Sequence, residues 1–454
     1  MNAFMKIVIV GCGKVGTSIA SELNLAGHDI VVIDISRAAV TRLSDSIDGM
    51  GIEGNGATYE TLSEAGAGDA DLVIAVTARD EVNLYTCLMA RVCGCVNTIA
   101  RVRNPEYTND LFRVKDILGL SMFINPELTA AVEISRLLRF SGALEIDSFS
   151  KGMVELIKIS VPDKSPLAGQ MISKIDILRG KVRVCTVERG GEVYIPNGDF
   201  VIRGGDRISI VSKPDIAAKF FKKAELNIGR SRDVMILGGG KISYYLAQRL
   251  LKAGVSVKII EKNAERCLEL SETLHDAVII HGDCMDQDLL ISEGIEHTDG
   301  VAALMDYDEE NILISMYSKN VSKAKVITKV NNAHFDSIID QIDLECVINP
   351  KKIAGEYIAR YVRAVQNSLG SNVETLYRLH EDRVEALEFR AKSGSRVLGK
   401  PLSALDFKDD LQVICIARKG RIILPIGSDM ILPDDSVVII TKHKGLSDLN
   451  DILK

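Results

Sequence analysis

Residues 7–16 read IVIVGCGKVG, and residues 234–243 read VMILGGGKIS. The first stretch is an apolar run of β-forming residues that ends in a Gly-x-Gly-x-x-Gly loop and leads into a helix-like segment at residues 17–27. A strand, a glycine loop and a helix in this order predict a dinucleotide-binding turn. Because the loop is nearly repeated, the question is whether the nucleotide is a reagent or a signal.

The second half of the chain repeats the first half at a nearly constant offset. Gly238 follows its counterpart Gly11 by 227 residues, and residues 423–440 follow the similar residues 194–211 by 229. The insertions between the two copies are therefore small over the whole length. This constancy indicates a tandem duplication.

Both copies have the same internal plan. Strand-like and helix-like segments first alternate, which predicts a parallel sheet with helices on both faces. An Asn-Pro pair then starts a helix, since Asn is a good cap and Pro suits the first helical turn. Short alternating strands with Gly, Pro and Asp turns follow and indicate a small α+β module. We expect lobe 1 at 1–124, a connector helix at 125–147 and a module at 148–223, then lobe 2 at 230–348, a connector at 349–372 and a module at 373–454, with the joint at 224–233.

The first glycine loop contains the residues that a diphosphate requires. Gly11 permits the tight turn, Gly13 lets the backbone approach a pyrophosphate, and Gly16 lets helix and strand pack closely. The N–H groups and the dipole at the helix start attract the phosphates. Asp34 ends the second strand, DIVVID, where a carboxylate binds ribose hydroxyls and repels a 2′-phosphate. This favours NAD or plain adenine nucleotides over NADP.

Further wall residues follow from the rule that ligands lie beyond the carboxyl ends of parallel strands. Asn55, Thr77, Ala78 and Arg101 each follow a predicted strand of the first lobe. Arg101 is able to pair with a phosphate through two N–H groups. A surface ion pair is the alternative for this residue.

The second repeat departs from the first at several of these positions. Ser243 adds a side chain where close packing is needed, so the second site is expected to bind more weakly or differently, or to be purely structural. The changed positions are Ser243 for Gly16, Met305 for Thr77 and Lys329 for Arg101, and the retained ones are Gly238, Gly239, Gly240, Glu261 and Asp283.

Composition narrows the class of protein. The 454 residues carry a net charge of −7 and include no long Lys/Arg tract, so no nucleic-acid partner is expected. No apolar run reaches the roughly 18 residues of a membrane span, and the N-terminus lacks a signal-peptide layout, which together predict a cytoplasmic protein. The nine Cys show no paired spacing and the seven His are scattered, so we expect no disulfide framework, metal site or catalytic residue.

The order of GCGKVG, Asp34, EGNGA, AVTARDEVN, IAR and NPE, over essentially the whole chain, resembles the TrkA family. Members of that family are peripheral regulatory subunits of Trk potassium-uptake systems, built from two tandem RCK (regulator of K⁺ conductance) units. The resemblance implies an α/β fold with two Rossmann-like lobes that bind NAD⁺ or NADH, with ATP and ADP as further ligands. It also implies a homo-oligomeric ring on the inner face of the cell membrane, beneath a potassium pore subunit of the TrkH/TrkG type.

Carried over by position, the resemblance implies two sets of cofactor-binding residues. The first set is Gly11, Cys12, Gly13, Lys14 and Val15 on the phosphates, Asp34 on the ribose, and Thr77, Ala78 and Arg101 in the wall, and the second is Gly238, Gly239, Gly240, Lys241, Ile242 and Glu261, with Asp283 as a further candidate.

Two nucleotide folds without a catalytic complement favour a nucleotide-sensing regulatory subunit over an enzyme. The rival hypothesis is an NAD-dependent oxidoreductase whose small modules bind substrate. It requires an acid or base near the nicotinamide, and the sequence identifies none. A third hypothesis, a nucleotide-binding adaptor for another transporter, shares the same fold.

Overall fold

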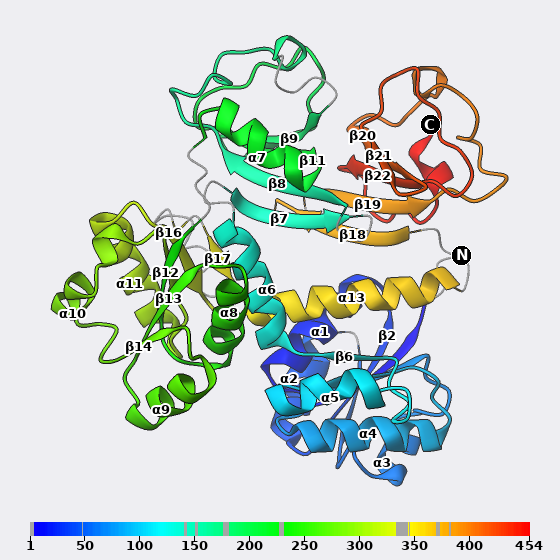
Figure 1. The fold of residues 1–454 in the computed structure, drawn as a ribbon. Coiled ribbons are helices and arrows are strands. Elements are labelled where there is room, and N and C mark those ends of the chain that lie inside the picture. The colour runs from blue at the N-terminus through cyan, green and yellow to red at the C-terminus, as the bar shows by residue number, and fades with distance from the viewer. Residues whose placement is uncertain are drawn as a thin grey trace.

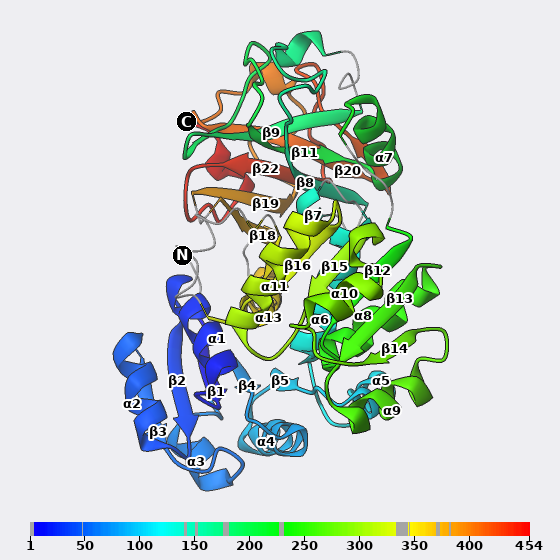
Figure 2. The same ribbon diagram turned by 90° about the vertical axis from the view of Figure 1, so that its left-hand side faces the viewer.

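The structure is a computed structural model that describes residues 4–47, 49–139, 143–149, 153–175, 181–226, 231–332, 344, 346–368, 373–380 and 383–454. Two parallel-sheet lobes lie in its lower half, and two small antiparallel modules lie side by side above them (Figures 1 and 2). Parts of the expected domain bounds lie outside the described residues, namely 1–3, 140–142, 227–230 and 369–372.

Lobe 1 is a six-stranded sheet of order β3-β2-β1-β4-β5-β6 in which every neighbouring pair is parallel. Its central strands are continuous apolar runs because helices cover both faces. The expected fold class is therefore confirmed for this lobe. Its elements are β1 (Lys6–Val10), α1 (Lys14–Leu25), β2 (Asp29–Asp34), α2 (Arg37–Ser46), β3 (Met50–Glu53), α3 (Tyr59–Glu64), β4 (Leu72–Ala75), α4 (Asp80–Cys93), β5 (Thr98–Arg101), α5 (Pro105–Val114) and β6 (Met122–Ile124).

Lobe 2 repeats this topology with the order β14-β13-β12-β15-β16-β17, again with parallel pairs only. The strand order is the one expected of a duplication. The elements are β12 (Asp233–Leu237), α8 (Lys241–Lys252), β13 (Ser256–Glu261), α9 (Ala264–Thr273), β14 (Val278–His281), α10 (Gln287–Ser292), η4 (Ile295–His297), β15 (Gly300–Ala303), α11 (Asp308–Val321), β16 (Lys325–Lys329) and β17 (Val347–Ile348).

Each small module contains a five-stranded antiparallel sheet, of order β10-β9-β11-β8-β7 in module 1 and β18-β19-β22-β20-β21 in module 2. The elements are β7 (Ala143–Phe149), β8 (Val154–Ser160), η2 (Ile172–Lys174), β9 (Val182–Arg189), β10 (Glu192–Tyr194), β11 (Arg207–Ser212) and α7 (Pro214–Lys223), then β18 (Val373–Leu379), β19 (Val384–Arg390), η6 (Leu402–Ala404), β20 (Leu411–Arg418), β21 (Arg421–Ile423), β22 (Ser436–Thr441) and η7 (Leu449–Ile452).

The connector helices are α6 (Pro126–Arg139) and α13 (Pro350–Ser368). The first is shorter than the expected 125–147, because the alternating residues of ALEIDSF, from Ala143, already form strand β7. Both helices start at the expected Asn-Pro pairs, and the side chain of Asn125 accepts a hydrogen bond from the N–H of Leu128 at 2.9 Å.

Each connector helix packs on the lobe of the other repeat. Helix α13 lies along α1 of lobe 1, and α6 lies against α8 of lobe 2 (Figure 1). Ile358 and Val362 of α13 are fully buried in one hydrophobic cluster with Ile19 and Leu23 of α1. The core of lobe 1 is thus completed by residues more than three hundred positions away in the chain.

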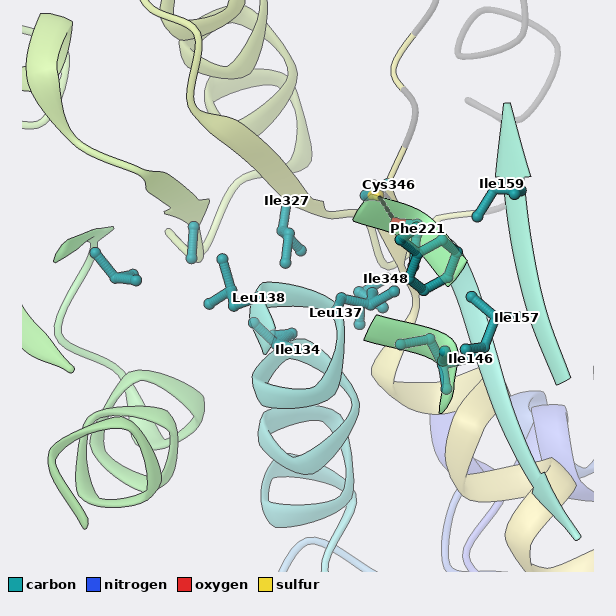
Figure 3. Packing of buried hydrophobic residues seen from close by; sticks show 14 of the residues in the cluster. Ile134, Leu137, Leu138, Ile146, Ile157, Ile159, Phe221, Ile327, Cys346 and Ile348 are labelled. Atoms are coloured by element: carbon teal, nitrogen blue, oxygen red, sulfur yellow. Dashed lines mark hydrogen bonds between the residues drawn. The ribbon is translucent and has the colours of Figure 1, made fainter. Parts of the chain in front are cut away.

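The contact between α6 and lobe 2 is also a hydrophobic core. Ile134 and Leu138 of α6 face Ile327 of β16 in the core of lobe 2, and Leu137 lies toward Phe221 of module 1 (Figure 3). One continuous core therefore joins lobe 2, the connector of repeat 1 and module 1.

The two modules also share a core. Apolar residues of β8 and β9 form one cluster with apolar residues of β19, β20 and β22. At its edge the buried ring of His380 lies 2.8 Å from the hydroxyl of Thr186 and 3.0 Å from a carboxylate oxygen of Glu188. The two repeats therefore contact each other both through their lobes and connector helices and through their small modules.

Among the described residues, no helix combines the length and the apolar character needed to cross a bilayer.

The exchange of connectors predicts a long-range effect on stability. Ile358→Ala should lower the free energy of unfolding by about 2–4 kcal/mol, since it leaves a cavity in a closed core. It should speed hydrogen exchange of amides in α1 rather than in α8. The matched variant Ile134→Ala should show the reverse pattern. Unchanged exchange in α1 after Ile358→Ala would contradict the exchanged packing.

Candidate functional site

A cavity of about 920 Å³ lies between the two lobes, at the carboxyl ends of their parallel strands. The glycine loops that precede α1 and α8 both line it, as do the first residues of α6 and α13. Its size lies within the range of small-molecule and cofactor sites. The two repeats therefore build one site region together.

The first loop has the backbone geometry of a phosphate cradle. Gly11 adopts a φ of +109°, and a Cβ there would lie 2.9 Å from the backbone N of Thr77. A Cβ on Gly13 would meet nothing within 4 Å, and Gly13 lines the cavity. Gly13 is also the N-cap of α1, and because glycine has no side chain it cannot cap the first N–H groups of that helix, which suit an anionic ligand.

The third glycine shows how the repeats diverged. A Cβ on Gly16 would lie 1.8 Å from the carbonyl oxygen of Gly11, so that loop admits no side chain there. Its counterpart Ser243 is buried, and its hydroxyl donates to the carbonyl of Gly238 at 2.6 Å. The side chain expected to disturb the second loop thus forms a hydrogen bond that holds it.

The acid at the end of the second strand contacts the loop in both lobes. One oxygen of Asp34 accepts the backbone N–H of Cys12 at 2.7 Å, and one oxygen of Glu261 accepts that of Gly239 at 2.6 Å. Asp34 also lines the cavity, where a ribose hydroxyl pair would reach it. Burial, with a smaller contribution from Asp34, raises the pKa of Cys12 to about 12, so Cys12 is a neutral thiol.

The far wall of the first site is held by Asn83, which the sequence interpretation did not single out. Its side-chain oxygen accepts the backbone N–H of Thr77 at 2.7 Å, and its amide donates to the carbonyl of Arg101 at 2.9 Å. Asn311 makes the equivalent bonds to Met305 and Lys329. The repeated Asn in DEVN and DEEN was the available signal.

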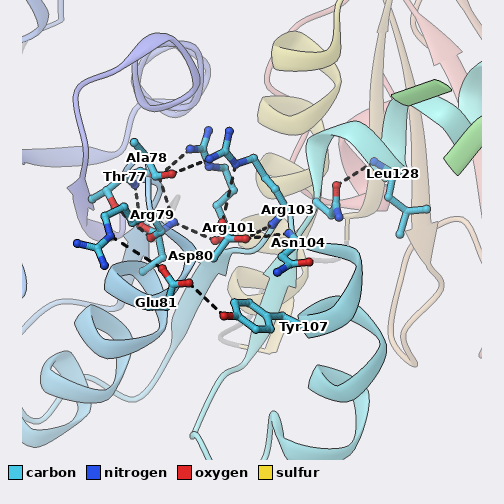
Figure 4. A network of polar contacts seen from close by, with 12 residues as sticks. Thr77, Ala78, Arg79, Asp80, Glu81, Arg101, Arg103, Asn104, Tyr107 and Leu128 are labelled. Carbon is cyan, nitrogen blue, oxygen red and sulfur yellow. Dashed lines mark hydrogen bonds and ion pairs between the residues drawn. The ribbon is translucent and has the colours of Figure 1, made fainter. Parts of the chain in front are cut away.

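Arg101 is 8% exposed and lines the cavity. Its guanidinium donates to the carbonyl of Thr77 at 2.6 Å, while its Nε has no hydrogen-bond partner among the described residues (Figure 4). Burial lowers the pKa of Arg101, and the neighbouring Arg103 lowers it further. A buried cation with an unused donor suits an anionic ligand, whereas a surface ion pair does not describe it.

The acidic residues Asp80 and Glu81 stabilise the wall of the first site through hydrogen bonds. Asp80 accepts the backbone N–H groups of Arg103 and Asn104, each at 2.8 Å, and Glu81 accepts the hydroxyl of Tyr107 at 3.2 Å (Figure 4). Within the described residues, no group of three or more His, Cys, Asp and Glu is arranged to hold a metal ion.

Most of the residues predicted to bind a nucleotide line the cavity, and more of them come from lobe 1 than from lobe 2. The expected residues that line it are Gly11, Gly13, Lys14, Val15, Asp34, Asn55, Thr77, Ala78, Arg101, Gly240, Lys241 and Ile242, whereas Cys12, Gly238, Gly239, Glu261 and Asp283 do not line it. Asp283 instead closes a local turn, in which it accepts the N–H of Met285 at 2.9 Å.

Two side chains of lobe 2 are larger than their counterparts in lobe 1. Arg266 stands where lobe 1 has Ala39, and its Nε donates to the carbonyl of Gly239 at 2.7 Å. Met285 likewise stands where lobe 1 has Ala57. These two substitutions, which sequence reasoning missed, make the second loop region differ from the first.

The charge of the cavity lining is strongly unbalanced. Seven basic side chains line it against three acidic ones, which favours an anionic ligand. The basic residues are Lys14, Arg79, Arg101, Arg103, Lys241, Lys329 and Lys351, and the acidic ones are Asp34, Glu127 and Asp306. The sequence interpretation missed Arg79, Arg103 and Asp306, which lie in the lobes next to the predicted wall residues. It missed Glu127 and Lys351 because the exchange of connectors is not visible in the chain order.

The two loops should respond differently to the same side chain. Gly16→Ala should lower the free energy of unfolding by about 3 kcal/mol, because a methyl group cannot fit against the carbonyl of Gly11. Ser243→Ala should cost only about 1 kcal/mol, the value of one hydrogen bond. Urea unfolding of both variants measures the difference. Equal losses would contradict the distinct loop geometries.

Comparison with known proteins agrees with this architecture. The TrkA-N domain pattern matches residues 7–126 and 234–350, and the TrkA-C domain pattern matches residues 156–224 and 386–454. In fold, the chain is similar to the structure entitled "GsuK channel bound to NAD", with a TM-score of 0.64 and 16% identity over 97% of this chain and 77% of that one.

Two full-length relatives are closer in sequence. The "Trk system potassium uptake protein TrkA homolog" of Archaeoglobus fulgidus is 33% identical over 99% of this chain and 100% of its own length. The "Trk system potassium uptake protein TrkA" of Halomonas elongata is 32% identical over 96% of this chain and 93% of its own. Since the domain patterns match both repeats and these relatives align end to end, the chain belongs to the TrkA family.

Proposed function

We propose that this protein is a nucleotide-sensing regulatory subunit of a Trk-type potassium-uptake system. The observation that carries the proposal is the cavity between the lobes, which two glycine loops and seven basic side chains line. Such a lining suits the phosphates of a nucleotide. The names of the full-length relatives support the assignment to potassium uptake.

The ligand proposed for the first site is NAD⁺ or NADH, with ATP or ADP competing for the same groove. Backbone N–H groups from Gly13 to Val15 would bind the phosphates, and Asp34 would bind the ribose hydroxyls. Thr77 and Arg101 would close the wall. The fold similarity to a channel entitled as bound to NAD is consistent with this ligand class.

The second site would use Gly240, Lys241 and Ile242 for phosphate. Gly238, Gly239 and Glu261 would support that loop from behind, since Glu261 accepts the N–H of Gly239. Arg266 donates to the carbonyl of Gly239 at 2.7 Å, and its large side chain would make this site bind a nucleotide more weakly or in another pose.

The proposed mechanism is a change in the angle between the lobes. A ligand shifts such an equilibrium only by its differential affinity for two states, typically about 1–3 kcal/mol per coupled site. Several copies in a ring would multiply this bias and transmit it to a pore subunit of the TrkH/TrkG type. The ring would lie on the cytoplasmic side of the membrane, and each repeat would contribute one lobe, one connector helix and one module to it.

Potassium flux tests the proposal. Vesicles that contain the pore subunit should change their flux when this protein and NADH, NAD⁺, ATP or ADP are added. The double variant Gly13→Val and Gly240→Val should abolish the nucleotide effect, because both side chains would project into the cavity, where a Cβ meets no protein atom within 4 Å.

Single variants and an activity assay complete that experiment. Gly13→Val alone should remove more of the nucleotide effect than Gly240→Val alone. Identical flux under all conditions would contradict the proposal. Consumption of NADH in the presence of candidate hydroxy acids or amino acids would favour the rival oxidoreductase.

A further inference from the structure

A hydrogen-bonded contact joins α8 of lobe 2 to the wall of the first site. The hydroxyl of Tyr245 in α8 accepts a hydrogen bond from the side-chain amide of Asn125 at 3.0 Å and donates one to the backbone carbonyl of Arg103 at 3.3 Å. Tyr245 and Asn125 are both buried, so water competes little for these bonds. Because Tyr245 belongs to repeat 2 and its two partners belong to repeat 1, this hydroxyl links the two repeats directly.

One end of this contact lies close to the second glycine loop. Helix α8 begins at Lys241, directly after that loop, and Gly240, Lys241 and Ile242 line the cavity. Tyr245 follows Lys241 by about one turn of the helix, and its side chain packs in the core of lobe 2. A ligand that binds the N–H groups at the start of α8 therefore acts on the segment that carries Tyr245.

The other end of the contact is part of the wall of the first site. Arg103 lines the cavity, and its guanidinium donates to the carbonyl of Ala78 at 2.6 Å. The backbone N–H groups of Arg103 and Asn104 donate to the carboxylate of Asp80, each at 2.8 Å (Figure 4). The bond from Tyr245 to the Arg103 carbonyl is long for a hydrogen bond, so a small shift of α8 is enough to strengthen or weaken it.

The corresponding contact in the other half of the molecule is built differently. Ser18 of α1 is the counterpart of Tyr245, and its hydroxyl donates to the carbonyl of Lys351 at 3.3 Å. Asn331 is the counterpart of Arg103, and its carbonyl accepts the ammonium of Lys351 at 3.2 Å. The wall of lobe 2 is thus bonded to a connector helix of its own repeat, whereas the wall of lobe 1 is bonded to the helix that follows the other loop.

We propose that the hydroxyl of Tyr245 couples the two sites, so that a ligand at the second glycine loop acts through it on the wall of the first site. Tyr245 is a positioning residue in this account, since it acts on the ligand of the first site only through Arg103. By thermodynamic reciprocity, a ligand at the first site acts on α8 through the same contact. This inference rests on the proposed nucleotide binding and concerns how the two sites communicate.

Hydrogen exchange in a single-site background tests the proposal. Gly13→Val blocks the first site, so that added ADP binds only at the second. ADP should then slow exchange of the amides of Arg103 and Asn104 by roughly fivefold, the lower end of typical coupling between sites. Adding Tyr245→Phe, which keeps the aromatic ring and removes the hydroxyl, should abolish this slowing. Calorimetry on the same variants measures ADP binding at the second site.

The matched control is Tyr244→Phe, the same chemical change at the preceding residue of α8. The hydroxyl of Tyr244 accepts a hydrogen bond from Gln248 of the same helix at 2.8 Å, so this variant should keep the slowing. Thermal unfolding of every variant confirms that it is folded.

Two sets of results separate this inference from the proposed function. If bound ADP leaves the two amides unchanged, or slows them equally without the Tyr245 hydroxyl, the inference is overturned while the proposed function stands. The same holds if Gly13→Val binds no ADP although the wild type does. If the wild type binds none of NADH, NAD⁺, ATP and ADP, the proposed function fails as well.

Discussion

The structure depends on the packing of each connector helix against the lobe of the other repeat. Helix α13 completes the apolar core over α1, and α6 completes the core over α8. Small residues make this contact close, since a Cβ on Gly355 of α13 would lie 3.4 Å from the side chain of Ser18. The relative position of the lobes is therefore set by buried surface, and neither lobe has a complete core without the other repeat.

The shared cavity is a direct consequence of this exchange. The carboxyl ends of the two parallel sheets face each other, so residues from both repeats surround any ligand that enters. After the duplication, substitutions in either repeat therefore changed the lining of the same cavity. Arg266 binds the carbonyl of Gly239 in the second loop, whereas Lys351 of α13 adds a basic side chain to the cavity lining. Ligands at the two proposed sites would share these walls, so binding at one would act on residues that surround the other.

The local parts of this picture could be predicted from the sequence. The glycine loops, Asp34 and the parallel sheets follow from short-range patterns of turns and buried strands. The exchange of the connector helices could not be predicted, because the residues around Pro126 and Pro350 do not indicate which lobe each helix packs against. Lys351 was therefore read only as part of a connector. The hydrogen bond from Arg266 to Gly239 was missed for a related reason, since the direction of the Arg266 side chain depends on the loop that it contacts.

We propose that nucleotide binding changes the angle between the two lobes, which the exchanged connector helices join. Electron–electron distance measurement tests it with spin labels at the exposed positions Glu60 in α3 and Asp288 in α10, in a Cys93→Ser background because the other cysteines are buried. The account predicts that saturating nucleotide shifts the distance distribution, and that Gly13→Val with Gly240→Val prevents the shift. An unchanged distribution in the presence of a nucleotide shown to bind would contradict it.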